Sequence, residues 1–329
     1  MTEQNSEQMA CCAASRDTKL PLTVTQNPQS FPAPAGSVNS KNMAAIKGGM
    51  FLMGSDYKFG FPGDGEGPIQ EVKLNPFLMD VTAVTNKNFA NFVKETGYRT
   101  DAEKFGWSFV FYKFISIKNL PAANQSPPGT PWWRRLDGAS WKHPEGPGSN
   151  VKSKMNHPVV HVSWNDAHAF ADYYGKRLPT EAEWEFAARG GQHQKLYPWG
   201  DELNPDGQHM CNIWQGKFPD FDSEEDGFSG TAPAKNYLPN DYGLYNLVGN
   251  VWEWQQDWFS NSFRTSDNRN NPKGPKIGTS KTIKGGSYLC HESYCNRYRV
   301  AARSANTPDS STGNLGFRCV SDTEPTSRK

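Results

Sequence analysis

The sequence lacks both a long apolar segment and a strong net charge. Residues 1 to about 25 are polar, with no basic stretch followed by an apolar run, and no apolar run elsewhere is long enough to cross a bilayer. The 35 basic and 34 acidic residues give a formal net charge of +1, so no global field recruits nucleic acid or an anionic membrane surface. We therefore expect a soluble, cytoplasmic protein with neither nucleic acid nor a membrane as partner.

Apolar residues are scarce as well, at 36% of the chain. However, 11 Trp, 12 Tyr and 19 Phe each bring a large apolar surface, so a sizeable core can be built from aromatic side chains. The 30 Gly and 24 Pro favour turns and short strands over long helices. At 329 residues, one or two domains are allowed, and regular secondary structure should be sparse.

Cysteine is too sparse for a secreted, disulfide-stapled protein of this length. Cys11 and Cys12 lie in a polar leader with nothing to position them, and we assign them no function. For Cys211 and Cys319, buried free thiols are favoured over a mutual disulfide. The usual motifs of serine hydrolases, P-loop proteins, zinc proteases and dinucleotide-binding enzymes are absent.

The chain begins with a leader, residues 1–42, whose Ser, Asn, Gln and Pro content indicates disorder. Two short strands about Gly48-Gly49 are expected between residues 45 and 54, and another strand from residue 71 to 79. Three helices carry start and stop signals, and they run from Thr85 to Gly97, from Ser163 to Gly175 and from Thr180 to Gly190.

The most informative feature is the pair Cys290 and Cys295. Five residues of extended strand would separate their Cα atoms by about 16 Å, so a disulfide or a shared ligand requires a bent loop. Gly285-Gly286 and the polar insert between the cysteines favour such a loop. The spacing leaves open a structural disulfide, a metal site with His291 as third ligand or base, and a redox or nucleophilic pair. The sequence gives little support for a zinc site, because no second ligand set accompanies the pair. Copper(I), in contrast, tolerates two thiolate ligands. On the residues alone, a disulfide or a redox pair ranks first.

Two loops are rich in oxygen ligands of the kind that calcium prefers. One spans residues 238–254, and the other is the acidic stretch 220–228, with Asn212 just upstream; its alternative reading is a solvated charged loop. The tripeptide Trp164-Asn165-Asp166 is used for calcium in some lectins, but here it opens a helix, and we expect a helix cap.

Two further stretches could recognise a peptide. Residues 119–156 form a long Pro-, Gly- and Trp-rich loop, whose tryptophans either pave a groove or anchor the loop in the core. The arginines from Arg297 to Arg303 can orient a peptide or bind a carboxylate, unless Asp309 neutralises one of them internally.

Several stretches together resemble the sulfatase-modifying factor family. They are residues 48–55 (GGMFLMGS), 157–167 (HPVVHVSWNDA), 177–185 (RLPTEAEWE), 249–254 (GNVWEW) and 285–288 (GGSY). A more specific set resembles the formylglycine-generating enzymes within that family: 290–295 (CHESYC), 297–299 (RYR), 306–311 (NTPDSS) and 314–319 (NLGFRC). The resemblance implies a loop-rich, C-type-lectin-like single domain of the α+β class over residues 43–322, followed by a tail, 323–329.

The resemblance also implies an activity, the aerobic oxidation of the cysteine in a C-x-P-x-R segment of an unfolded sulfatase to Cα-formylglycine, with a thiol reductant. Cys290 and Cys295 match the family's copper(I) ligands, and Ser287, Trp252 and Tyr294 match positions that line the oxygen and copper site. Soft thiolates suit copper(I), and a tryptophan face excludes water. The resemblance would thus reverse the ranking drawn from spacing alone.

Calcium and substrate positions carry over in the same way. The implied calcium ligands form two sets, Asn246, Gly249, Val251 and Glu253 in one and Asn212, Ile213, Asp226 and Phe228 in the other, both with a structural role. Ser108, Trp132 and Trp133 match the groove side of the family and are expected peptide contacts.

The chain also departs from the family's animal members. Ala171 and Ala188 stand where cysteines would be expected, which leaves Cys319 without an evident partner and favours a prokaryotic, cytoplasmic enzyme. Two alternatives are a catalytically silent sulfatase-binding paralogue and an iron-dependent sulfur-transfer enzyme on the same fold. Retention of both Cys290 and Cys295 counts against the first, and the absence of an H-x3-H-x-E motif counts against the second.

Overall fold

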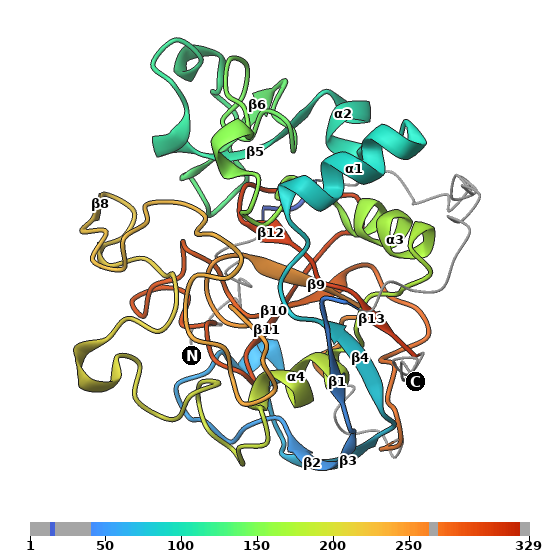
Figure 1. The fold of residues 1–329 in the computed structure, drawn as a ribbon. Coiled ribbons are helices and arrows are strands. Elements are labelled where there is room, and N and C mark those ends of the chain that lie inside the picture. Colours follow the sequence, from blue (N-terminus) through green and yellow to red (C-terminus); the bar gives the residue numbers. More distant parts are fainter. Residues whose placement is uncertain (1–13, 17–40, 263–268, 323–329) are drawn as a thin grey trace, which may run out of the picture.

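The computed structural model describes residues 14–16, 41–262 and 269–322, and most of this chain runs in loops that connect short elements. Helices and small sheets are mixed along the sequence, as expected for the α+β class (Figure 1). Within the predicted leader, residues 14–16 pack against the body, and Ala14 and Arg16 are buried. Cys11, Cys12, the rest of the leader before residue 41 and the tail lie outside the described residues.

The three predicted helices are confirmed, and each begins at its predicted cap. They are α1 (Asn86–Thr96), α3 (Trp164–Tyr173) and α4 (Glu181–Arg189). Thr85, Ser163 and Thr180 each accept a hydrogen bond from the backbone N–H three residues on, which satisfies an otherwise unpaired donor. Trp164-Asn165-Asp166 therefore opens a capped helix, as predicted.

A fourth helix, α2 (Asp101–Phe105), was not predicted, although Thr100 and Glu103 form a capping box that signals it. Short 3-10 turns complete the helical elements of the described chain. They are η1 (Pro62–Asp64), η2 (Tyr112–Phe114), η3 (Leu120–Ala122), η4 (Lys152–Lys154) and η5 (Pro205–Gly207).

The first strands form two separate small sheets. β1 (Met43–Ile46) pairs with β4 (Phe77–Asp80), which also pairs with β13 (Val320–Ser321), while β2 (Gly49–Met53) pairs with β3 (Gln70–Leu74). Two strands about Gly48-Gly49 are confirmed. The single strand expected from residue 71 to 79 is wrong, because it is two strands that separate at Asn75-Pro76, where proline has no N–H to donate.

A four-stranded sheet brings distant segments together. Its order is β11 (Arg303–Asn306), β10 (Lys281–Lys284), β9 (Trp252–Trp258) and β12 (Leu315–Gly316). Two hairpin-like pairs lie apart from it: β5 (Trp107–Phe111) with β6 (Trp133–Asp137), and β7 (Gly216–Lys217) with β8 (Phe221–Asp222). In Figure 1, α1, α2 and the β5–β6 pair lie above this sheet, and α4, β2 and β3 lie below it. The cysteine loop connects β10 to β11.

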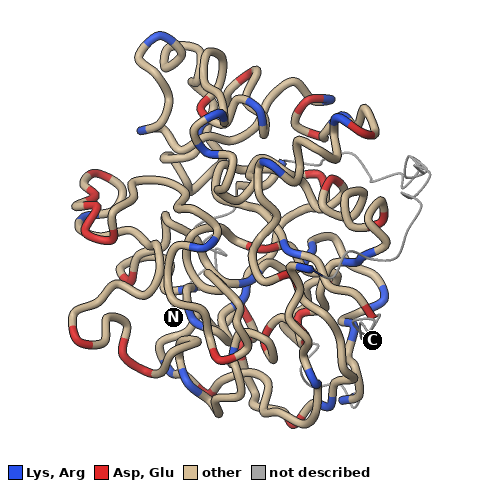
Figure 2. Tube along the Cα trace, viewed as in Figure 1, with Lys and Arg blue, Asp and Glu red and all other residues tan. Residues whose placement is uncertain are grey.

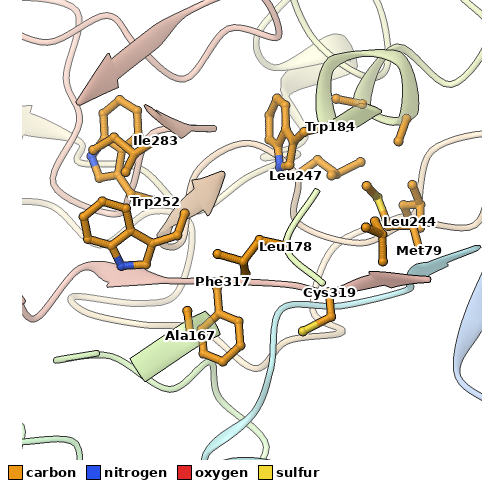
Figure 3. Packing of buried hydrophobic residues seen from close by; sticks show 14 of the residues in the cluster. Met79, Ala167, Leu178, Trp184, Leu244, Leu247, Trp252, Ile283, Phe317 and Cys319 are labelled. Atoms are coloured by element: carbon orange, nitrogen blue, oxygen red, sulfur yellow. The ribbon is translucent and has the colours of Figure 1, made fainter. Parts of the chain in front are cut away.

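The core is aromatic, as predicted. Trp184, Trp252 and Phe317 are fully buried in one large cluster together with Cys319 (Figure 3). Cys211 is buried in the same cluster, and both thiols are free, so the favoured reading is confirmed and a mutual disulfide is excluded. Burial raises the pKa of both thiols, which keeps them protonated and unreactive at neutral pH.

Charged residues of both signs are spread along the described chain, and several acidic residues lie beside β8 (Figure 2). Three arginines that follow Cys295 in the sequence are buried and already paired. Arg297 pairs with Asp64 at 2.6 Å, Arg299 with Glu66 at 2.5 Å and Arg303 with Glu181 at 2.6 Å. They therefore hold loops together instead of facing a ligand, and their partners are not Asp309. None of the described helices is both long and apolar enough to span a bilayer.

Candidate functional site

The sulfurs of Cys290 and Cys295 lie 2.9 Å apart, and both side chains have 0% exposure. The bent loop required by their spacing is therefore present. The two residues are thiols in this structure, not half-cystines. They belong to the same buried cluster as Trp252, so the pair faces a dry, aromatic interior.

The loop is bent by glycines and by its own backbone hydrogen bonds. Gly285 and Gly286 have φ angles of 92° and 72°, and a Cβ on Gly285 would lie 2.5 Å from the carbonyl oxygen of Leu247. The amide of Cys290 donates to the carbonyl of Ser287 at 2.9 Å, and the amide of Ser287 lies 3.4 Å from the Cys290 sulfur. The backbone thus turns the Cys290 thiol back over Ser287.

Ser287 is tied to Trp252 through a residue that the sequence analysis did not identify as part of the site. The side-chain amide of Asn314 donates to the Ser287 hydroxyl at 2.9 Å, and the Asn314 carbonyl accepts from the Trp252 amide at 2.9 Å. The fully buried Trp252 indole N–H has no hydrogen-bond partner within the described chain. Asn314 immediately precedes β12, and the parallel pairing of β12 with β9 places it beside Trp252. Ser287 follows β10, which pairs with the other edge of β9, so the two residues meet.

An aromatic shelf lies beside the cysteine loop, and we define it as Trp132, Phe218 and Tyr294. Tyr294 stacks on Phe218 with ring centroids 3.9 Å apart, and Trp132 meets both rings edge-on, at 5.6 Å from Tyr294 and 5.1 Å from Phe218. The Tyr294 hydroxyl donates to the carbonyl of Leu289, which fixes the ring against the loop. All three rings are partly exposed. No sequence pattern marks Phe218, whose place comes from tertiary packing.

The other two expected peptide contacts do not reach the surface. Trp133 is fully buried, and the buried hydroxyl of Ser108 lies 2.8 Å from His161 Nδ1 and 2.8 Å from the Ser311 hydroxyl. Direct contact of Ser108 or Trp133 with a peptide conflicts with this burial. The histidine within the cysteine loop, His291, bonds through Nδ1 to the Ser293 hydroxyl at 2.8 Å.

The residues Asn212, Ile213, Asp226 and Phe228 form one oxygen-rich group. Asn212 Oδ1 is buried without a hydrogen-bond partner among the described residues, which is the state expected of a cation ligand. The Asp226 carboxylate accepts from the amides of Ile213 and Phe228, both at 3.0 Å, and burial raises its pKa. A nearby cation would offset that burial, so this set fits calcium.

The set Asn246, Gly249, Val251 and Glu253 fits only in part. Asn246 Oδ1 is also buried without a described partner. The Glu253 carboxylate, however, already accepts from Trp184 Nε1 at 2.7 Å and from two nitrogens of Arg318 at 2.7 and 2.8 Å. Across the described chain, no group of three or more His, Cys, Asp and Glu side chains is arranged to hold a metal ion.

Known proteins with similar sequences cover most of the chain. The family described as "Sulfatase-modifying factor enzyme 1-like domain" matches residues 28–323. A "Formylglycine-generating enzyme" of Thermomonospora curvata is 58% identical over 286 residues, 86% of this chain and 94% of that protein. One of Streptomyces coelicolor is 54% identical over 297 residues, covering 90% and 94%. An "Inactive C-alpha-formylglycine-generating enzyme 2" of Bos taurus is 46% identical over 289 residues, covering 87% and 90%.

A solved structure supports the same fold at lower identity. PvdO from Pseudomonas aeruginosa superimposes with a TM-score of 0.63 at 21% identity, over 85% of this chain and 94% of that one. At that identity the likeness concerns the fold alone. The family match and the relatives above 50% identity settle the classification: this chain belongs to the sulfatase-modifying factor family, with formylglycine-generating enzymes among its similar relatives.

Proposed function

We propose that this chain is an oxidase that converts the cysteine of a C-x-P-x-R segment in an unfolded sulfatase to Cα-formylglycine, using O2 and a thiol reductant. One observation carries the proposal: two cysteine sulfurs lie 2.9 Å apart in a dry site, in a chain 58% identical to a formylglycine-generating enzyme. We keep a cytoplasmic location as a prediction.

Copper(I) is the metal that this donor set fits, because two adjacent buried thiolates are soft ligands that tolerate low coordination. Bound copper(I) would supply the redox chemistry between the substrate thiol and O2. Cys290 and Cys295 would hold the metal and leave a position for the thiol of the substrate. Trp252, which is fully buried in the same cluster as the two cysteines, would help to keep water out of this site.

Ser287 provides an oriented hydroxyl. Its oxygen accepts from the Asn314 side chain at 2.9 Å and from the Leu289 amide at 3.4 Å. Because both contacts use the oxygen as acceptor, the hydroxyl proton is left to donate to a further partner. Asn314 acts here as a positioning residue that fixes the rotamer of Ser287.

The aromatic shelf suits the peptide. Trp132, Phe218 and Tyr294 present partly exposed ring surfaces next to the cysteine loop, and an apolar residue of an extended segment can pack there. Calcium at Asn212, Ile213, Asp226 and Phe228 would hold the loops behind the shelf together. At Asn246 and Glu253 an ion would have to share the carboxylate with Arg318.

A silent binding paralogue is the second candidate, since proteins named as inactive are 46% identical to this chain. The higher identity to proteins named as generating enzymes, and the presence of both cysteines, favour the oxidase.

A turnover assay separates the two candidates. Copper-loaded protein is incubated with a C-x-P-x-R peptide, O2 and a thiol, and mass spectrometry follows conversion of thiol to aldehyde. The same peptide with serine at the cysteine position is the control. A bound but chemically unchanged cysteine peptide would leave the paralogue as the better reading.

A further inference from the structure

Three residues of the leader, Ala14 to Arg16, lie in the body of the protein and contact residues far along the chain, from Trp107 to Ser311. Arg16 is 4% exposed. Its amide donates to the Ser310 hydroxyl at 2.7 Å, and its Nε donates to the Asp309 carbonyl at 3.0 Å. Its Nη2 donates to the Trp107 carbonyl at 2.8 Å and to the Ser311 hydroxyl at 3.2 Å. This many contacts indicate a pocket shaped for a guanidinium.

Rings and carboxylates complete the Arg16 pocket. The guanidinium carbon lies 3.9 Å from the Trp107 ring centroid and 4.3 Å from that of Phe105. Burial opposes the charge and lowers the Arg16 pKa to about 10, while the carboxylates of Asp309, Asp101 and Asp166 attract it. The pocket thus combines aromatic stacking with negative charge, which selects arginine over apolar side chains.

The preceding two residues are held as a peptide would be. Ser15 donates to Asn306 Oδ1 at 2.6 Å, and Asn306 Nδ2 donates to the Ala14 carbonyl at 3.2 Å. Ala14 is 1% exposed and belongs to the same apolar cluster as Leu289, the residue before Cys290. The segment therefore runs from the vicinity of the cysteine loop to the arginine pocket.

The leader sequence matches this placement. Residues 12–16 read Cys-Ala-Ala-Ser-Arg, so an arginine follows a cysteine by four positions, the spacing of C-x-P-x-R with alanine in place of proline. We propose that the leader binds in cis the groove used by the substrate peptide and competes with it. This inference rests on the proposed function for the identity of the competing peptide.

The competition should be measurable because a tethered segment has a high effective concentration, of millimolar order for short linkers. Removing the Arg16 guanidinium removes its charge-assisted hydrogen bonds, so docking should weaken by about tenfold or more. Since the docked leader must be displaced before a peptide binds, weaker docking gives tighter binding in trans.

The test uses three full-length proteins without copper: the natural chain, Arg16→Ala and Lys19→Ala. Fluorescence anisotropy measures the Kd of a labelled C-x-P-x-R peptide. We expect Arg16→Ala to bind it about tenfold more tightly. Lys19→Ala, which removes a charge from the same leader, should match the natural chain. Equal affinity of Arg16→Ala and the natural chain would overturn the proposal.

Limited trypsin digestion gives an independent readout of docking. In the natural chain, cleavage after Arg16 should be much slower than cleavage after Lys19, and equally fast cleavage at both positions would also overturn the proposal. Neither measurement requires turnover. If the peptide competes with the leader but is never oxidised, the proposed oxidase activity is wrong, whereas the proposal that the leader docks in cis still holds.

Discussion

The guanidinium of Arg318 forms a bidentate pair with the carboxylate of Glu253, with Nε 2.7 Å from Oε2 and Nη2 2.8 Å from Oε1. The Trp184 indole donates to Oε2 at 2.7 Å, and both charged side chains are fully buried. Because Glu253 follows Trp252 on β9, this ion pair fixes the strand that carries Trp252, a member of the same buried cluster as Cys290 and Cys295.

Removing Arg318 should therefore be costly. Arg318→Ala leaves a buried carboxylate uncompensated, and we expect a loss of about 3–5 kcal/mol in the free energy of unfolding by urea. Lys195→Ala is the control, because its pair with Asp201 is exposed and should be worth about 0–1 kcal/mol. Adding Glu253→Gln to Arg318→Ala should recover part of the loss. Equal effects of Arg318→Ala and Lys195→Ala would contradict this account.

Gly285 sets the entry to the cysteine loop, and alanine there should fail for two reasons. The φ of 92° is strained for any side chain, at about 1–2 kcal/mol, and the added Cβ would lie 2.5 Å from the Leu247 carbonyl oxygen. Gly148→Ala is a matched control, since Gly148 has a φ of 91° with nothing within 4 Å of a Cβ. Thermal and urea unfolding should show Gly285→Ala to be less stable than Gly148→Ala by about 1–3 kcal/mol. Similar stability of the two variants would mean that the loop shifts enough to relieve the contact between the added Cβ and the Leu247 carbonyl oxygen.

The features that could be predicted from the sequence are those determined by interactions between residues close together in the chain. Thr85, Ser163 and Thr180 cap their helices because side chain and amide lie within three residues of each other, whatever the fold. The bend between Cys290 and Cys295 followed from geometry, but spacing ranked a disulfide first, and only the surrounding motifs pointed to a metal.

The remaining features depend on contacts between distant segments. Asn314 reaches Ser287 because β12 pairs with β9, and Phe218 reaches Tyr294 through packing alone. Trp133 and Ser108 matched the family's groove by position, yet they are buried, because alternation along β5 and β6 does not reveal which face the next layer covers. Arg16 lay in a leader whose composition indicated disorder, and its pocket is assembled from residues 105–107 and 309–311.

Asp257 should make stability fall with rising pH. Its burial, together with repulsion from Glu181, raises its pKa from 3.8 to about 7. The folded chain thus keeps a proton that the unfolded chain releases, so this contribution is full below about pH 4 and is lost as pH rises to 7, by about 4 kcal/mol in total. Asp257→Asn retains an acceptor for the Glu181 amide, which now donates to Asp257 Oδ2 at 2.9 Å.

Urea unfolding from pH 4 to pH 8 tests this assignment. The Asp257→Asn variant should equal the natural chain near pH 4 and exceed its stability by up to about 4 kcal/mol at pH 8. Parallel pH profiles of the two proteins would show that Asp257 is ionised in the folded state throughout.

Calcium should stabilise the protein through Asn212 and Asp226. A ligand that binds only the folded state at 100 times its Kd adds about 2.7 kcal/mol, so chelation should lower the thermal midpoint reversibly. Asn212→Ala removes the orphaned Oδ1 and should abolish the calcium-dependent part of the midpoint. Asn150→Ala, whose side chain bonds only locally to Lys152 in the described contacts, should keep it. If chelator leaves the thermal midpoint of the natural chain unchanged, calcium does not bind at this site.

Copper binding should depend on two of the four described cysteines. Cys290→Ser or Cys295→Ser replaces a soft sulfur with a hard oxygen, and we expect copper(I) affinity, measured against a competing chelator, to fall by at least about 100-fold. Cys211→Ser is the matched control, because Cys211 is buried in the same cluster but its sulfur is not one of the two that lie 2.9 Å apart. Circular dichroism verifies that each variant is folded. If Cys290→Ser and Cys295→Ser bind copper(I) like Cys211→Ser, the two adjacent sulfurs are not its ligands.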